Sequence, residues 1–129
     1  MDLSNIKTEQ EAQVMELLHP VTGEVIRDDK EKAFTITLLG SDTNSYKAEF
    51  NAVLKEVRAQ KKDPTERESE KRGATMLAKI TTDCYLIMDG KKMKHSVEAM
   101  AELYFNPEYT WIREQVEAFT RNRANFIKS

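Results

Sequence analysis

The chain has 129 residues, which fits one domain and excludes a multi-domain enzyme, because a single hydrophobic core usually serves about 100–150 residues. Hydrophobic residues make up 40% of the sequence and charged residues 33%, with 4 glycines and 3 prolines, so a core can form and a collagen-like or loop-rich chain is excluded. The formal net charge is −2, and a nucleic-acid partner would therefore need a local basic patch.

Cysteine and histidine are too scarce to build a disulfide or a zinc scaffold. Cys84 is the only cysteine, and together with His19 and His95 it cannot complete a four-ligand zinc site without carboxylates. The N-terminal residues lack the basic and apolar regions of a signal peptide, and no stretch approaches the roughly 18–20 apolar residues that cross a bilayer. We therefore expect a cytoplasmic protein with no membrane partner, no metal and no cofactor.

The first structured element predicted is a β-hairpin. Residues 12–20 and 34–40 are rich in β-branched and bulky apolar residues, and a Pro-Val-Thr-Gly turn signal and a charged run separate them. In the second segment Phe34, Ile36 and Leu38 alternate with threonines, so one face of the hairpin is apolar. Because an isolated hairpin is marginally stable in water, we expect helices or another chain to cover this face.

Two long helices are predicted next, over residues 43–61 and 64–88, with Asp63 as the N-cap of the second. The first helix has apolar side chains at helical spacing, which predicts a buried stripe: Tyr46, Phe50, Val53 and Val57. The second helix opens with charged, solvated turns and then carries a similar stripe: Leu77, Ile80, Cys84 and Ile87.

Two shorter helices complete the predicted fold. An Asp-Gly loop precedes a short helix capped by Ser96, and Asn106 caps a last helix over residues 107–124. The predicted fold class is mainly α, with about four helices in a small bundle and a small N-terminal β-hairpin. Residues 1–11 are polar and without a period, which indicates a flexible arm, and residues 12–129 are expected to form a single domain.

No catalytic constellation is recognisable in the sequence. Glycine-rich phosphate loops, nucleophile elbows, HExxH and CxxC are absent, and the carboxylates are interleaved with Lys and Arg as on a solvated helix face. His19 and His95 have no assignable partner, and Cys84 on its apolar stripe is expected to pack as a small hydrophobe. We therefore expect a protein that is not an enzyme.

The basic residues form two local groups, which lie in one loop and near the C-terminus: Lys91, Lys92, Lys94 and His95; Arg113, Arg121, Arg123 and Lys128. Near the C-terminus the cations outnumber Glu114 and Glu117 only slightly. That excess is more typical of cations at a helix C-terminus than of a phosphate-binding track. The sequence therefore predicts no nucleic-acid partner.

Apolar side chains in unusual places are the candidates for binding a partner. Trp111 lies about 100° around the helix from Ile112, off the buried stripe. Phe126 and Ile127 lie among the last four residues, where chains usually fray unless something holds them. Two interpretations stay open for Phe126: it closes the core beside Phe119, or it joins the others in an aromatic anchor for another protein.

Three segments resemble the tail assembly chaperones of bacteriophages with long, non-contractile tails: residues 18–26, 34–46 and 106–126. The last segment is the most specific. Several of its residues stand at the spacing of that family: Trp111-Ile112-Arg113, Gln115-Val116, Phe119 and Asn125-Phe126. The resemblance covers most of residues 12–127, although the charged stretch at 66–72 is not family-like.

The resemblance implies a small, non-catalytic protein that binds the tape measure protein, keeps it soluble and promotes polymerisation of the tail tube around it. It also implies self-association, a host-cytoplasmic location, absence from the mature virion, and a longer frameshifted form that contacts the tail tube protein. On this interpretation Trp111, Phe126 and Ile127 anchor the partner, and the cations of the last helix form a polar rim: Arg113 and Arg121.

Other functions remain open at this point. A head-tail connector or a tail-completion protein of similar size would also lack catalytic motifs, but it would stay in the virion. A small DNA-binding regulator is a third candidate, because consecutive short helices imitate a helix-turn-helix. The acidic balance and the lack of a basic recognition helix argue against that regulator.

Overall fold

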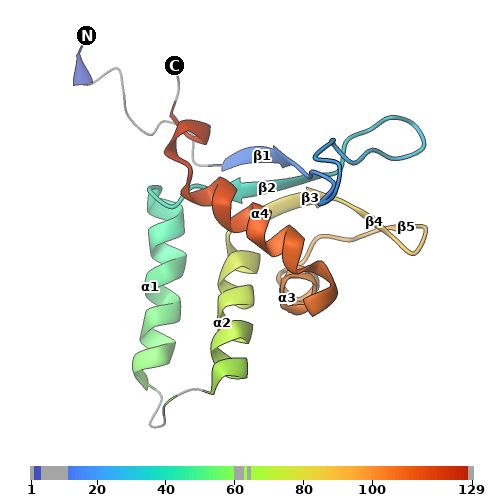
Figure 1. The fold of residues 1–129 in the computed structure, drawn as a ribbon. Helices are drawn as coiled ribbons and strands as arrows, with labels where there is room; N and C mark the ends of the chain where they lie inside the picture. Colours follow the sequence, from blue (N-terminus) through green and yellow to red (C-terminus); the bar gives the residue numbers. More distant parts are fainter. Residues whose placement is uncertain (1, 4–11, 60–62, 64, 128–129) are drawn as a thin grey trace.

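The structure is a computed structural model that describes residues 2–3, 12–59, 63 and 65–127. The arm predicted at residues 1–11 lies almost entirely outside the described residues. Within the described residues the chain forms four α-helices, a three-stranded sheet and a separate two-stranded hairpin (Figure 1).

A three-stranded antiparallel sheet forms the centre of the structure. β1 (Ala12–Glu16) pairs with β2 (Thr35–Leu39), and β2 pairs in turn with β3 (Thr81–Tyr85). The predicted hairpin is therefore confirmed, with β2 as the middle strand. Side chains alternate between the two faces of a sheet, and one row of paired residues is buried: Met15, Ile36 and Cys84.

The prediction of one helix over residues 64–88 is wrong. α2 (Glu66–Lys79) ends early, and the chain continues into β3 and then into a hairpin of β4 (Ile87–Met88) and β5 (Lys91–Lys92). From Asp83 to Leu86, exposed or half-buried side chains alternate with buried ones, which is the period of a strand. Threonines at 81 and 82 also favour a strand, and β2 supplies the hydrogen-bonding partner.

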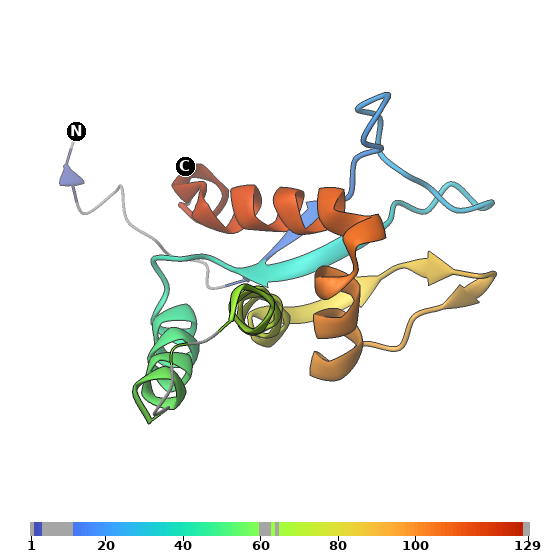
Figure 2. The same cartoon turned by 60° about the horizontal axis from the view of Figure 1, so that its bottom comes forward.

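The predicted fold class, a mainly α bundle with a small hairpin, is wrong as well. The described residues do form four α-helices, but these pack around the sheet (Figures 1 and 2). α4 (Thr110–Arg121) crosses the sheet and contacts β2, while α2 packs against α3 (Val97–Phe105). Helices thus cover the apolar face of the hairpin, as expected. The sequence did not suggest the third strand, β3, which pairs with β2 and makes the sheet wider than the hairpin.

Side-chain caps set several helix ends. Ser96 Oγ accepts a hydrogen bond from Ala99 N at 3.0 Å, which confirms the predicted cap of α3. α2 begins two residues later than predicted, because its N-cap is Thr65. Asn106 also acts as a cap, but it begins a 3₁₀ turn, Pro107–Tyr109, that precedes α4 in place of one helix over 107–124.

The first helix, α1 (Asn44–Ala59), lies at the margin of the molecule and packs against α2. Of its predicted stripe only Val53 is buried, and Phe50 is 45% exposed. α1 therefore leaves much of its apolar side in solvent, and the prediction of a fully buried stripe is wrong.

The core joins the sheet to α2, α3 and α4 around the buried side chain of Tyr104. Its hydroxyl shares a hydrogen bond of 2.8 Å with Thr81 Oγ1, which donates to the carbonyl oxygen of Leu77, also at 2.8 Å. Burial raises the pKa of Tyr104 well above its ordinary value, so this phenol stays protonated.

Candidate functional site

Apolar side chains from several elements line an open groove of about 290 Å³ beside Trp111. Asp89 is its only charged lining residue, and the volume falls at the lower limit of about 300 Å³ for small-molecule pockets. The groove therefore suits a few side chains of a polypeptide better than a whole cofactor. We call it the Trp111 groove, and these residues line it: Leu17, Ile26, Phe34, Leu86, Ile87, Met88, Asp89, Met93, Leu103, Tyr109, Trp111 and Ile112.

The β4–β5 hairpin forms one wall of the Trp111 groove. Asp89 and Gly90 have φ angles of 52° and 77°, the left-handed backbone that a tight hairpin turn requires and that Asp and Gly tolerate best. Met93 N donates to the carbonyl oxygen of Leu86 at 2.8 Å, which extends the pairing toward β3. This hydrogen bond holds Met93 beside the other groove residues of the hairpin.

The segment between β1 and β2 forms the opposite wall. Leu17 N donates to the carbonyl oxygen of Phe34 at 2.9 Å, and Ile26 N donates to that of Leu17 at 3.0 Å. Both walls extend from the same end of the sheet, to the right in Figure 1. Leu103 of α3 and Trp111 and Ile112 of α4 complete the lining. The Gln115 amide joins α4 to this wall, because it accepts from Leu18 N at 3.0 Å and donates to Leu18 O at 2.7 Å.

Trp111 lies in the first turn of α4, is half-buried and packs against the core from inside the groove. The sequence analysis placed it off the buried stripe, and the structure shows a side chain that is neither fully buried nor free of the core. Of the five residues predicted to bind a partner, Trp111 is the one that lines the groove.

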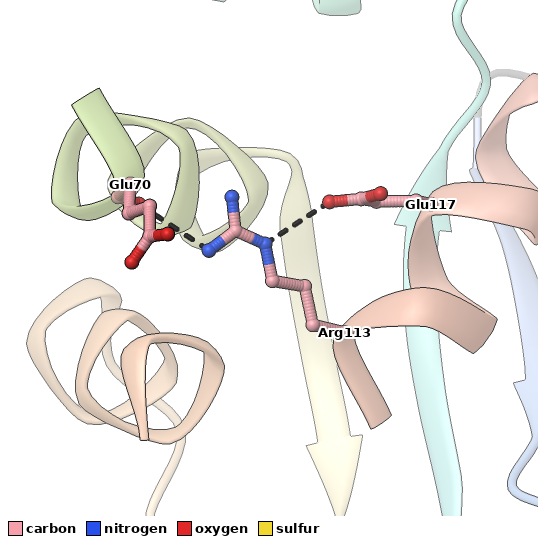
Figure 3. A network of polar contacts seen from close by, with 3 residues as sticks. All are labelled: Glu70, Arg113 and Glu117. Atoms are coloured by element: carbon pink, nitrogen blue, oxygen red, sulfur yellow. Dashed lines mark hydrogen bonds and ion pairs between the residues drawn. The ribbon is translucent and has the colours of Figure 1, made fainter. Parts of the chain in front are cut away.

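Arg113 lies between α4 and α2 (Figure 3). Its Nε donates to Glu117 Oε1 at 3.0 Å, and its Nη1 donates to the backbone oxygen of Glu70 at 3.3 Å. A β-carbon at Gly73 would lie 2.6 Å from Nη2, so glycine leaves the room that the guanidinium fills. Arg113 thus holds α4 and α2 together. Its side chain does not line the Trp111 groove.

Phe126 packs at the junction between β2 and α1 and is 3% exposed. Its ring meets Phe119 edge to face, with 5.7 Å between ring centroids, and covers Gly40, where an added β-carbon would lie 2.6 Å from Cγ of the ring. This position matches the interpretation that Phe126 closes the core. Ile127 is half-buried next to it, and Arg121 is exposed at the end of α4.

The sequence analysis missed the wall of the groove that the β4–β5 hairpin forms, because Leu86 to Met88 were assigned to a helix. One local signal could have located it: the Asp89-Gly90 dipeptide, interpreted in the sequence analysis only as a loop, is typical of a two-residue hairpin turn.

Tyr85 connects the two walls on the outer side of the sheet. Its hydroxyl donates to Asp28 Oδ2 at 2.6 Å, and the Nζ atoms of Lys32 and Lys92 lie 3.9 and 5.4 Å from its ring centroid. The hydrogen bond from Tyr85 and those from the backbone amides of Lys32 and Lys30 lower the pKa of Asp28 below its ordinary value of 3.8.

The Tyr85→Phe substitution is expected to raise the pKa of Asp28 toward its ordinary value, because the strongest donor to the ionised carboxylate is removed. A carboxylate with a lowered pKa in the folded state stabilises the fold above its ordinary pKa, and this contribution is lost as the pH falls through the lowered value. NMR titration of the Asp28 carboxyl carbon in both proteins measures the shift. An Asp28 pKa that is unchanged in Tyr85→Phe would contradict the role assigned to this hydrogen bond.

The remaining candidate groups have structural partners. His19 Nδ1 accepts from the backbone amides of Val21 and Thr22, and His95 Nε2 donates to the Thr81 carbonyl oxygen at 2.8 Å. Cys84 is buried in β3, and burial raises the pKa of its thiol.

In the described part of the chain no three side chains of His, Cys, Asp or Glu gather as metal ligands. None of the described helices has the length and apolar character of a membrane span. Neither a protein-family model nor a curated protein nor a solved structure matches this chain.

Proposed function

We propose that this chain is a tail assembly chaperone of a long-tailed bacteriophage, and that the Trp111 groove binds apolar side chains of the tape measure protein. The observation that carries this proposal is the open apolar groove with a half-buried tryptophan and a single charged lining residue. Such grooves suit the apolar face of an amphipathic helix, and aromatic residues dominate the energy of protein interfaces.

The family resemblance and the groove involve the same parts of the chain. Several groove residues lie within the three segments on which the resemblance rests, residues 18–26, 34–46 and 106–126, or directly before one of them: Leu17, Ile26, Phe34, Tyr109, Trp111 and Ile112. The two hydrogen bonds between Leu18 and Gln115 also join the first of these segments to the last. Both observations support a role of these segments in one binding surface.

The proposed mechanism requires no bond-breaking step. Several copies of the chaperone would each cover a short apolar stretch of the long tape measure protein until tail tube subunits replace them. Many weak contacts on one client give high avidity through effective concentration, and each contact is still easy to displace. In this proposal the protein acts in the host cytoplasm, self-associates on the client, and reaches the tail tube protein through a longer form.

Co-expression with the tape measure protein of the same phage tests the proposal. We expect the soluble fraction of the tape measure protein to rise and the two proteins to co-purify. Expression of the tape measure protein alone, or with an unrelated protein of similar size, provides the baseline. A soluble fraction that stays at this baseline would contradict the proposal.

Mass spectrometry of purified virions separates this function from that of a head-tail connector or tail-completion protein. A chaperone is expected to be missing from mature particles, whereas a connector or completion protein is present at a fixed copy number. Stoichiometric recovery of the chain from virions would overturn the proposed function.

A further inference from the structure

Positive charge is concentrated on one wall of the Trp111 groove. The side chains of Lys91, Lys92 and Lys94 are exposed on or next to the β4–β5 hairpin. Lys91 is paired with Met88 and Lys92 with Ile87, and paired residues in an antiparallel ladder extend to the same face. Successive strand residues extend to opposite faces, and the Lys92 Nζ atom lies 5.4 Å from the Tyr85 ring centroid, so Lys91 is the lysine that shares its face with the groove residue Met88. We call the exposed Lys91, Lys92 and Lys94 the lysine wall.

The other sides of the groove do not neutralise this charge. On the opposite wall, residues 27–32 contain three cations and three anions, and the carboxylate of Asp28 is engaged by Tyr85. At the floor, Glu108 is the acid next to Tyr109, and Asp89 lies in the turn of the hairpin itself. The lysine wall thus keeps an excess of positive charge directly beside apolar groove residues.

We propose that the Trp111 groove selects amphipathic segments whose apolar side is flanked by Asp or Glu. This inference rests on the proposed function and adds the chemistry of the partner. Apolar side chains enter the groove, and acidic residues beside them meet Lys91 and its neighbours at the rim. Such charge complementarity contributes more to partner choice and association rate than to total affinity, so it sorts clients without making them hard to release.

Trp111 is the only tryptophan of the chain, and its fluorescence therefore reports directly on the groove. Three synthetic peptides of about 18 residues serve as probes, since a helix of this length presents several turns of one apolar face. They share the same leucine positions and carry Glu, Lys or Gln beside them. We expect the Glu peptide to shift the Trp111 emission and to bind about tenfold more tightly than the Lys peptide at low salt.

Charge-reversed variants test the lysine wall itself. In the Lys91→Glu/Lys94→Glu variant the preference is expected to invert in favour of the Lys peptide. The matched control is Lys47→Glu/Lys55→Glu, which makes the same change in net charge at exposed positions of α1 and is expected to keep the original preference. At 1 M salt the preference of the unmodified protein should disappear, because the Debye length falls to about 3 Å.

The outcomes separate the two proposals. Equal binding of all three peptides with a shift of the Trp111 emission overturns the acidic preference and leaves the groove as a binding site. A preference for the Glu peptide that survives in Lys91→Glu/Lys94→Glu also overturns it. If none of the peptides changes the Trp111 emission or binds by calorimetry, the proposed function loses its site.

Discussion

Replacing Phe126 by alanine is expected to lower the free energy of unfolding by about 3–5 kcal/mol, because the change removes a fully buried aromatic ring and leaves a cavity. The ring joins three parts of the fold: it covers Gly40 after β2, meets Phe119 of α4, and anchors the end of the described chain. For a domain of this size the loss corresponds to a decrease in Tm of about 10–20 °C. Thermal and urea unfolding followed by circular dichroism measure it.

Two further variants show whether packing is the cause. Ile127→Ala changes the neighbouring, half-buried residue and is expected to cost clearly less than Phe126→Ala. Gly40→Ala should be destabilising on its own, because the new β-carbon would collide with the ring of Phe126. In the Gly40→Ala/Phe126→Ala double variant that collision is absent. Its loss in free energy of unfolding should therefore be smaller than the sum of the losses in the two single variants. An unchanged Tm in Phe126→Ala, with loss of co-purification, would instead identify Phe126 as an anchor for a partner.

Local sequence patterns predicted the parts of the fold that a short stretch of residues signals by itself. The β1–β2 hairpin follows from alternation and a turn signal. The start of α3 follows from Ser96, because its hydroxyl accepts a hydrogen bond from within the same helix start and needs no distant partner. The signal for each lies within a few residues of the chain, and distant contacts did not overrule it.

β3 was mispredicted because its local signals conflict: Thr81 and Thr82 favour a strand, but the apolar spacing is helical. Leu77, Ile80 and Cys84 stand at helical spacing, and only pairing with β2, more than forty residues earlier in the chain, makes a strand more stable there. The same error hid the β4–β5 hairpin and with it one wall of the groove. The packing of Arg113 against Gly73 was equally invisible, because nothing in the sequence links the first turn of α4 to the middle of α2.

The candidate site was predictable only at Trp111. Helical geometry alone placed this side chain off the buried stripe, and that position next to the stripe is where a residue can line a groove and also touch the core. Phe126 shows the opposite case: a large aromatic residue near a chain end can either be exposed for a partner or close the core. In the structure the ring is buried against Gly40 and Phe119, a packing that no local sequence pattern reveals.

Replacing Trp111 by alanine is expected to weaken binding of the tape measure protein by about 30-fold or more, equivalent to about 2 kcal/mol, the range of a tryptophan hot spot. The side chain supplies the largest aromatic surface of the groove, so under the proposed function its loss removes the main aromatic contact with the client. Affinity is measured by calorimetry with the purified client or a client peptide, together with the Tm of each variant.

Two variants distinguish a lost contact from a lost fold. Trp111→Phe keeps an aromatic ring at the same place in the groove and should recover part of the affinity. Phe50→Ala removes a 45%-exposed aromatic residue on α1, outside the groove, and is expected to leave client binding unchanged. Because Trp111 is half-buried, its alanine variant should also lose some stability, so binding is compared at a temperature where every variant is folded. Client affinity in folded Trp111→Ala equal to that of the unmodified protein would show that the groove is not where the client binds.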